Sequence, residues 1–453
     1  MHKKLIVYSY FLFSIFCFAN SQNLVIEVKG AQTHKAILYS LKGENNEKID
    51  SIFSGNNNYF TYTFKKNLFH TGFYRAVFNQ NIHIDFIYDG ENIYISTNSD
   101  DILDSLHVIN SLSNQLYYSF TKLNRSFKTK TDLLQLLLAK YPKDDNYYEK
   151  TKAELHHVQE NYLNFINVIS QKIPDSFIAR YIKSYQLPIV NAALPPNQQL
   201  EFLKSHSLDN VNFKDGELIF SDLFTVKTIE YLTYYRNPQM PKGILENEFK
   251  SAIDTILNKA KVNYKVYKQI VEYLIDGFRK FGFENDLKYI IDNYVIKDDL
   301  CLDNKTEKSI QLMINQDKIL HIDAIVPDIS MQDPSGKIVN LDKIESKKIL
   351  IIFYASWCPH CMALIPKLKK YLSTLHNHGL KVLAISLDTK RSDWINFINR
   401  NNLKWINISD LNGWDSKTAL DYYIYATPTM FLIDSNKKII AKPKNIGDLK
   451  NFL

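Results

Sequence analysis

Residues 349–361 read Ile-Leu-Ile-Ile-Phe-Tyr-Ala-Ser-Trp-Cys-Pro-His-Cys, and this stretch decides the fold of the C-terminal part of the chain. Its apolar first half predicts a buried strand, and the spacing of the apolar residues after it predicts a helix: Ile365, Leu368, Leu372 and Leu375. Cys358 and Cys361 therefore lie where a strand ends and a helix begins. A helix N-terminus carries partial positive charge, which stabilises a thiolate, the reactive form of cysteine.

The spacing of the two cysteines indicates redox chemistry. Two thiols three positions apart can close a small disulfide or open to a dithiol, and exchange with a substrate runs through a mixed disulfide. Cys358 is predicted to attack, and Cys361, one helical turn further, to resolve the intermediate. A zinc site needs about four ligands, and the sequence has no second C-x-x-C and no histidine cluster. We therefore predict no metal and no cofactor.

The hydrophobic pattern changes twice along the 453 residues, which predicts a multidomain chain. Residues 22–100 alternate in the manner of strands and predict an antiparallel β-sandwich, with Asp89-Gly90 as its best hairpin signal. Residues 101–320 show helical spacing and predict an all-α domain. Residues 321–453 alternate strands with helices and predict an α/β domain.

The N-terminus is typical of a secretory signal peptide. Lys3 and Lys4 precede an apolar stretch at 5–18, and Ala19-Asn20-Ser21 offers a cleavage site. The predicted domains are then a signal peptide at 1–21, the β domain, the helical domain and the α/β domain, in the periplasm or cell envelope. A lipoprotein anchored at Cys17 is the alternative, which the large Phe16 disfavours.

Charge and the remaining cysteine add little chemistry. The formal net charge of +7 is spread over the chain without a basic stripe, so we predict no nucleic acid partner. Cys301 is a lone thiol among charged residues; it is read as a free cysteine, with a regulatory role for the active pair as the alternative.

Three motifs together resemble the thioredoxin-fold domain of TlpA/ResA-like thiol–disulfide oxidoreductases, over residues 322–453. They are Val326-Pro327-Asp328 with Gly336-Lys337, residues 353–361, and residues 426–434, which read Ala-Thr-Pro-Thr-Met-Phe-Leu-Ile-Asp. The resemblance implies that Pro428 is cis and faces the cysteine pair. The backbone of Thr427 would then pair with an extended substrate segment. Trp357 would pack beside the site, or simply in the core.

Two departures from the family concern the proton of the second cysteine. Thioredoxin carries a buried acid where this chain has Ile352, and periplasmic reductases of the branch carry a glutamate where it has Leu364. Deprotonation of Cys361 therefore lacks an obvious partner. Pro359-His360 resembles the same pair in the oxidase DsbA, and a His360 imidazolium would stabilise the Cys358 thiolate. The alternative is an exposed histidine with little influence.

These residues predict an exported thiol–disulfide oxidoreductase, a protein-disulfide reductase that works through a Cys358–Cys361 disulfide. The resemblance implies disulfide-containing exported proteins as substrates and a membrane thiol protein as electron donor. Three alternatives stay open: a DsbA-like oxidase, a thiol peroxidase, and a partner-binding envelope protein with an auxiliary redox domain. A peroxidase usually has threonine where this chain has Ala355.

Overall fold

A computed structural model describes residues 22–453 except 32, 55–57, 66–67, 80–81, 103, 303 and 375–378. The predicted signal peptide and Cys17 lie outside the described residues. The chain divides into two compact units: residues 1–274 with 285–290, and residues 275–284 with 291–453. Within the described residues, none of the helices combines the length and apolarity needed to cross a bilayer.

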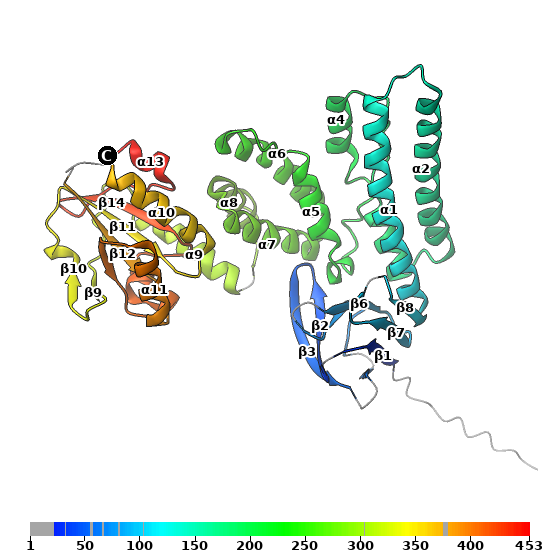
Figure 1. Cartoon of the computed structure of the whole chain (residues 1–453), viewed down its shortest axis with the longest axis horizontal. Coiled ribbons are helices and arrows are strands. Elements are labelled where there is room, and N and C mark those ends of the chain that lie inside the picture. The colour runs from blue at the N-terminus through cyan, green and yellow to red at the C-terminus, as the bar shows by residue number, and fades with distance from the viewer. Residues whose placement is uncertain are drawn as a thin grey trace, which may run out of the picture. The chain divides into compact units, whose positions relative to one another are not determined.

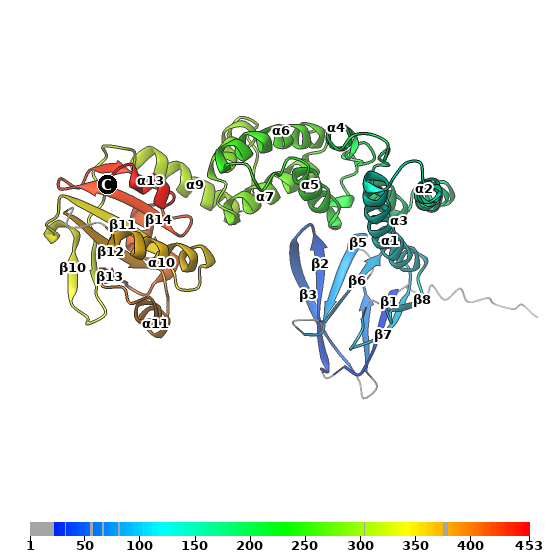
Figure 2. The same cartoon turned by 45° about the horizontal axis from the view of Figure 1, so that its top comes forward.

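The N-terminal part of the first unit consists of two four-stranded sheets (Figure 1), with strand orders β4-β1-β7-β8 and β3-β2-β5-β6. Alternate residues of both sheets meet in one hydrophobic core, which includes Leu24, Leu38, Phe60 and Phe86. Figure 2 shows the long β2–β3 hairpin at one edge of its sheet. The strands are β1 (Gln22–Lys29), β2 (Lys35–Lys42), β3 (Asn45–Phe53), β4 (Tyr59–Phe64), β5 (Gly72–Val77), β6 (His83–Tyr88), β7 (Ile93–Asn98) and β8 (His107–Asn110).

Three sequence predictions for this region are wrong. The first sheet is mixed, because β1 pairs with β7 in parallel. Asp89-Gly90 does form a turn, with Gly90 at φ 102°, but it joins β6 and β7, which belong to different sheets, so there is no hairpin there. β8 lies inside the range 101–320 that was expected to be helical.

The helical part of the first unit packs against these sheets. The Gly43 N–H donates to the Ser221 carbonyl at 3.0 Å, and the His70 ring stacks on Phe220 with centroids 3.5 Å apart. α1 and α2 run side by side (Figure 1). The helices are α1 (Leu112–Lys140), α2 (Asn146–Lys172), α3 (Phe177–Tyr185), α4 (Pro196–His206), α5 (Leu223–Thr233), α6 (Lys242–Ala260), α7 (Tyr264–Lys280), which ends in the second unit, and α8 (Glu284–Ile290).

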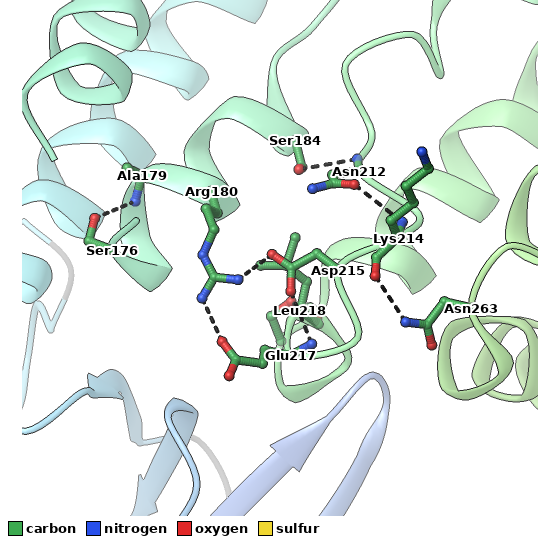
Figure 3. Close-up of polar contacts among 11 residues, drawn as sticks. Ser176, Ala179, Arg180, Ser184, Asn212, Lys214, Asp215, Glu217, Leu218 and Asn263 are labelled. Carbon is green, nitrogen blue, oxygen red and sulfur yellow. Dashed lines mark hydrogen bonds and ion pairs between the residues drawn. The ribbon is translucent and has the colours of Figure 1, made fainter. Parts of the chain in front are cut away.

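An ion-pair cluster fixes α3 to the loop that follows α4. Figure 3 shows the Arg180 guanidinium between two carboxylates: it donates to Asp215 and, at 2.6 Å, to Glu217. On the same loop, the Lys214 carbonyl accepts from the Asn263 amide at 2.9 Å. The Arg180 bonds join α3 to the loop after α4, so the cluster is a structural clamp.

The second unit contains the predicted α/β domain. Its five-stranded sheet has the order β13-β12-β11-β14-β15, with β11 parallel to β12 and antiparallel to β14. The strand β11 has β12 and β14 on its two edges, and every residue from 349 to 354 is buried. The elements are α9 (Asn304–Ile319), β9 (Ser330–Gln332), β10 (Ile338–Asn340), β11 (Lys348–Tyr354), α10 (Pro359–Ser373), β12 (Leu380–Ser386), α11 (Arg391–Asn401), β13 (Ile406–Ile408), α12 (Lys417–Asp421), β14 (Thr429–Asp434), β15 (Ile439–Ala441) and α13 (Ile446–Lys450), preceded by a π-helical turn at Ile291–Ile296.

α9 belongs to this second unit, although the sequence placed it at the end of the central helical domain. Its Gln316 amide donates to the carbonyls of Tyr422 and Tyr423, both at 3.0 Å. A side chain on α9 thus caps the loop that leads to β14.

Candidate active site

Cys358 lies at the junction between the central strand and its helix, as predicted. It is the N-cap residue of α10, and its sulfur accepts the Cys361 N–H at 3.3 Å. Pro359 takes the first helical position, where its missing N–H costs nothing. The site is closed, because Cys358 is only 4% exposed and Cys361 is fully buried.

Both cysteines are free thiols in this structure, and their environments push their pKa values apart. The Cys361 thiol donates to the Cys358 sulfur, as do the Thr427 side chain and the backbone N–H groups of residues 360 and 361. These hydrogen bonds outweigh burial and lower the pKa of Cys358 to about 5. Burial, and the adjacent Cys358 sulfur, raise the pKa of Cys361 well above its usual range. One sulfur is therefore prepared to attack, while the other holds its proton.

The loop before β14 closes over the attacking sulfur. The Thr427–Pro428 peptide is cis, which confirms that prediction. The Thr427 carbonyl oxygen lies 3.2 Å from the Cys358 sulfur. Thr427 and Pro428 are half-buried. A segment 69 residues away in the chain thus covers Cys358 and explains its low exposure.

Trp357 lies on the surface beside the cysteines and is not part of the core. Its side chain is 55% exposed, and its ring tilts against that of Trp414, which is 42% exposed, with centroids 6.3 Å apart. Two exposed indoles next to a reactive sulfur form an apolar surface. Such a surface can receive an apolar part of a substrate.

His360 is exposed, and its imidazole and its backbone N–H contact different groups. The imidazole Nε2 lies 2.7 Å from the carbonyl oxygen of Lys280, at the end of α7. Because a carbonyl can only accept, that nitrogen carries a proton. The backbone N–H of His360, in contrast, points to the Cys358 sulfur. Stabilisation of the thiolate by a charged imidazole stays a prediction.

The structure supplies a buried acid that the sequence reasoning missed. Ile352 is fully buried in β11 and Leu364 packs against the core, and neither hydrocarbon side chain can take a proton. Asp388, two residues beyond β12, is 1% exposed and lies beside the loop that carries Cys358. The signal was present as polar residues directly after an apolar parallel strand, the edge at which α/β sheets place functional groups.

Two further observations concern Cys301 and metal-binding side chains. Cys301 is exposed, and it is reduced like the other described cysteines. In the described ranges, no three His, Cys, Asp or Glu side chains are arranged to hold a metal ion.

Residues 322–442 match the AhpC/TSA family. Curated relatives include the thiol:disulfide interchange protein DsbE of Vibrio cholerae, 28% identical over 131 residues that cover 28% of this chain and 65% of that protein. The thiol-disulfide oxidoreductase ResA of Bacillus cereus is 25% identical over 130 residues, which cover 29% and 73%. The DsbE of Tatumella citrea is 32% identical over 120 residues, which cover 26% and 60%. The chain thus spans less than two thirds of the length of either DsbE.

Two solved structures are also similar. A thiol-disulfide oxidoreductase from Bacteroides fragilis is 30% identical with a TM-score of 0.27, over 28% of this chain and 99% of that one. A thioredoxin-like protein from Bacteroides caccae is 21% identical with a TM-score of 0.36, over 60% and 98%. Residues 322–442, which include the cysteine pair and the loop that faces it, therefore form a thioredoxin-like AhpC/TSA domain that is similar to the thiol–disulfide oxidoreductases DsbE and ResA.

Proposed function

We propose that the chain is an exported enzyme that reduces disulfides of envelope proteins through the Cys358–Cys361 pair. The observation that carries this proposal is the asymmetry between the two sulfurs. Hydrogen bonds lower the pKa of Cys358 to about 5, whereas burial keeps Cys361 protonated. An attacking thiolate and a waiting thiol are what a two-step exchange requires.

The reaction then proceeds by two sulfur displacements. The Cys358 thiolate attacks a substrate disulfide, forms a mixed disulfide and releases one substrate thiolate, which takes a proton from water. Cys361 gives its proton to water and attacks the Cys358 sulfur, closing the Cys358–Cys361 disulfide and releasing the second substrate thiolate. Two electrons pass to the substrate, and a thiol protein at the membrane restores the dithiol by the reverse exchange.

The surface around Cys358 supports a polypeptide substrate. Thr427 holds its carbonyl 3.2 Å from the sulfur, and its backbone can pair with an extended segment by strand addition. Trp357 and Trp414 offer apolar contact beside the same sulfur. An extended peptide with a disulfide and an apolar neighbour fits both features.

A DsbA-like oxidase is the second candidate, because a stabilised thiolate makes a disulfide more oxidising. The lowered pKa of Cys358 favours it. Equilibration of the purified chain with glutathione separates the two. A reduction potential below about −200 mV supports the reductase, and one near about −120 mV, the DsbA range, assigns the oxidase instead.

The experiment that tests the proposal is covalent trapping in the cells that produce the protein. A Cys361→Ser chain cannot resolve its intermediate, so it should accumulate mixed disulfides between Cys358 and its substrates. Mass spectrometry after diagonal gels identifies the partners. The matched control, Cys358→Ser with Cys361→Ser, should trap none. If the single variant also traps none, or only proteins that are not exported, the proposal fails.

A further inference from the structure

The strongest unassigned feature near the cysteines is the buried carboxylate of Asp388. It follows β12, which is parallel to β11, and the Leu387 N–H donates to the Tyr354 carbonyl at 2.8 Å. This bond extends the pairing past the ends of both strands. Asp388 is thereby placed next to Ser356, the residue two positions before Cys358.

Three donor groups converge on this carboxylate. The Ser356 hydroxyl donates to Oδ1 at 2.6 Å, and the Ser356 N–H lies 3.1 and 3.2 Å from the two oxygens. The Ser386 hydroxyl donates to Oδ2 at 2.7 Å. A buried charge is retained only where hydrogen bonds replace its hydration, and two of these three donors belong to the loop before the attacking cysteine.

The anchored loop in turn fixes the position of the Cys358 sulfur. The Cys358 N–H donates to the Ala355 carbonyl at 3.2 Å, so residues 355–358 form a tight turn. Ser356, pinned to Asp388, lies inside that turn. The groups that face the Cys358 sulfur are the Cys361 thiol, the N–H groups of residues 360 and 361, and Thr427. Their distances depend on how the turn is held.

We propose that Asp388 is a positioning residue for the cysteine pair, which holds through Ser356 the loop that aims Cys358 at Cys361 and Thr427. The inference rests on the proposed function and adds to it the residue that sets the reactivity of the attacking sulfur. The carboxylate does this from the loop after β12, whereas the acid of thioredoxin corresponds to Ile352 in β11.

If Asp388 acts by positioning the loop, its removal raises the pKa of Cys358. If it acts only through its charge, its removal lowers that pKa, so the two roles can be told apart. A negative charge near a thiol disfavours its ionisation, so deleting the charge alone lowers the pKa of Cys358. Releasing the loop weakens the hydrogen bonds to the thiolate and raises that pKa. The pH dependence of alkylation of the reduced full-length chain measures the pKa of Cys358 without any substrate.

In the Asp388→Ala variant we expect the pKa of Cys358 to rise by about one unit, since hydrogen bonds to a charged group are worth about 1.5–3 kcal/mol. The exchange equilibrium with glutathione should shift about tenfold toward the disulfide form, which is about 30 mV. Asp388→Asn keeps an acceptor for the Ser356 N–H and should lie closer to wild type. Asp393→Ala, at an exposed aspartate five residues on, should change neither quantity.

A fall or no change in the pKa of Cys358 in Asp388→Ala overturns the inference. If that variant does not fold, as judged by circular dichroism, Ser356→Ala decides: it removes one donor, and the pKa should move upward by less. An unchanged pKa there also overturns the inference. A wild-type chain that does not exchange with glutathione refutes the proposed function instead, because the alkylation experiment does not depend on catalysis.

Discussion

The Cys361 thiol is the largest single cause of the low pKa of Cys358, so its removal gives the sharpest test of the site. The change is Cys361→Ala in the reduced chain. It deletes one hydrogen bond to the Cys358 sulfur and leaves the N–H groups of residues 360 and 361 in place. Fewer hydrogen bonds then offset the effect of burial, which raises the pKa of Cys358.

The expected size follows from the value of a hydrogen bond to a charged group, about 1.5–3 kcal/mol. At about 1.4 kcal/mol for each pKa unit, the loss corresponds to about one to two units. The pKa of Cys358 should rise from about 5 to between about 6 and 7. Rates of alkylation by iodoacetamide across pH report this value, because only the thiolate reacts.

Cys361→Ser is the matched control, because its hydroxyl keeps a donor at nearly the same place. Its effect on the pKa of Cys358 should be smaller than that of alanine. If Cys358 still titrates near 5 in Cys361→Ala, Thr427 and the N–H groups of residues 360 and 361 account for the whole stabilisation, and the reasoning from the thiol is wrong. If serine and alanine behave alike, the effect is due to size and not to hydrogen bonding.

Three further predictions concern other parts of the chain. Asp286 is fully buried, neither of its oxygens has a hydrogen-bond partner, and burial raises its pKa from 3.8 to about 8. The folded state therefore keeps a proton that the unfolded state releases. The free energy of unfolding should fall as pH rises from about 4 to about 8, by at most about 6 kcal/mol. Urea unfolding across pH measures this slope, and Asp286→Asn should flatten it. Ile351→Ala, in the buried central strand, should cost about 2–5 kcal/mol of unfolding free energy, and a loss below about 1 kcal/mol would contradict the packing. Trp414→Ala should raise the KM for a disulfide peptide and leave the pKa of Cys358 unchanged, whereas an unchanged KM would exclude the two indoles from the substrate surface.

The α/β domain could be predicted from the sequence because its signals are local. The apolar run at 349–354 has to be buried on both faces, and it forms the buried strand β11. The motif at 426–434 contains the whole of β14, Thr429–Asp434. The cysteine pair follows β11 directly, so the helix N-terminus around it was predictable as well.

The errors in the first unit come from pairing, which local sequence does not specify. Asp89-Gly90 encodes a reversal of the chain, and the structure has one, but the turn says nothing of which sheet the next strand joins. The alternation of apolar and polar residues indicates which face of a strand is buried and does not indicate its direction. The parallel pairing of β1 with β7 therefore could not be predicted. Asp388 was missed for the same reason, since its link to Ser356 spans 32 residues.

The structure also bears on the direction of the proposed reaction. The nucleophilic cysteine of thioredoxin has a pKa near 7 and its couple a potential of about −270 mV. Lowering that pKa to about 5 stabilises the reduced form at pH 7 by a little over 2 kcal/mol, which raises the potential by about 50 mV. A couple near about −220 mV lies in the glutaredoxin range and about 100 mV below DsbA. The stabilised thiolate alone is thus a smaller effect than the difference between thioredoxin and DsbA, which supports the proposed reductase over the oxidase.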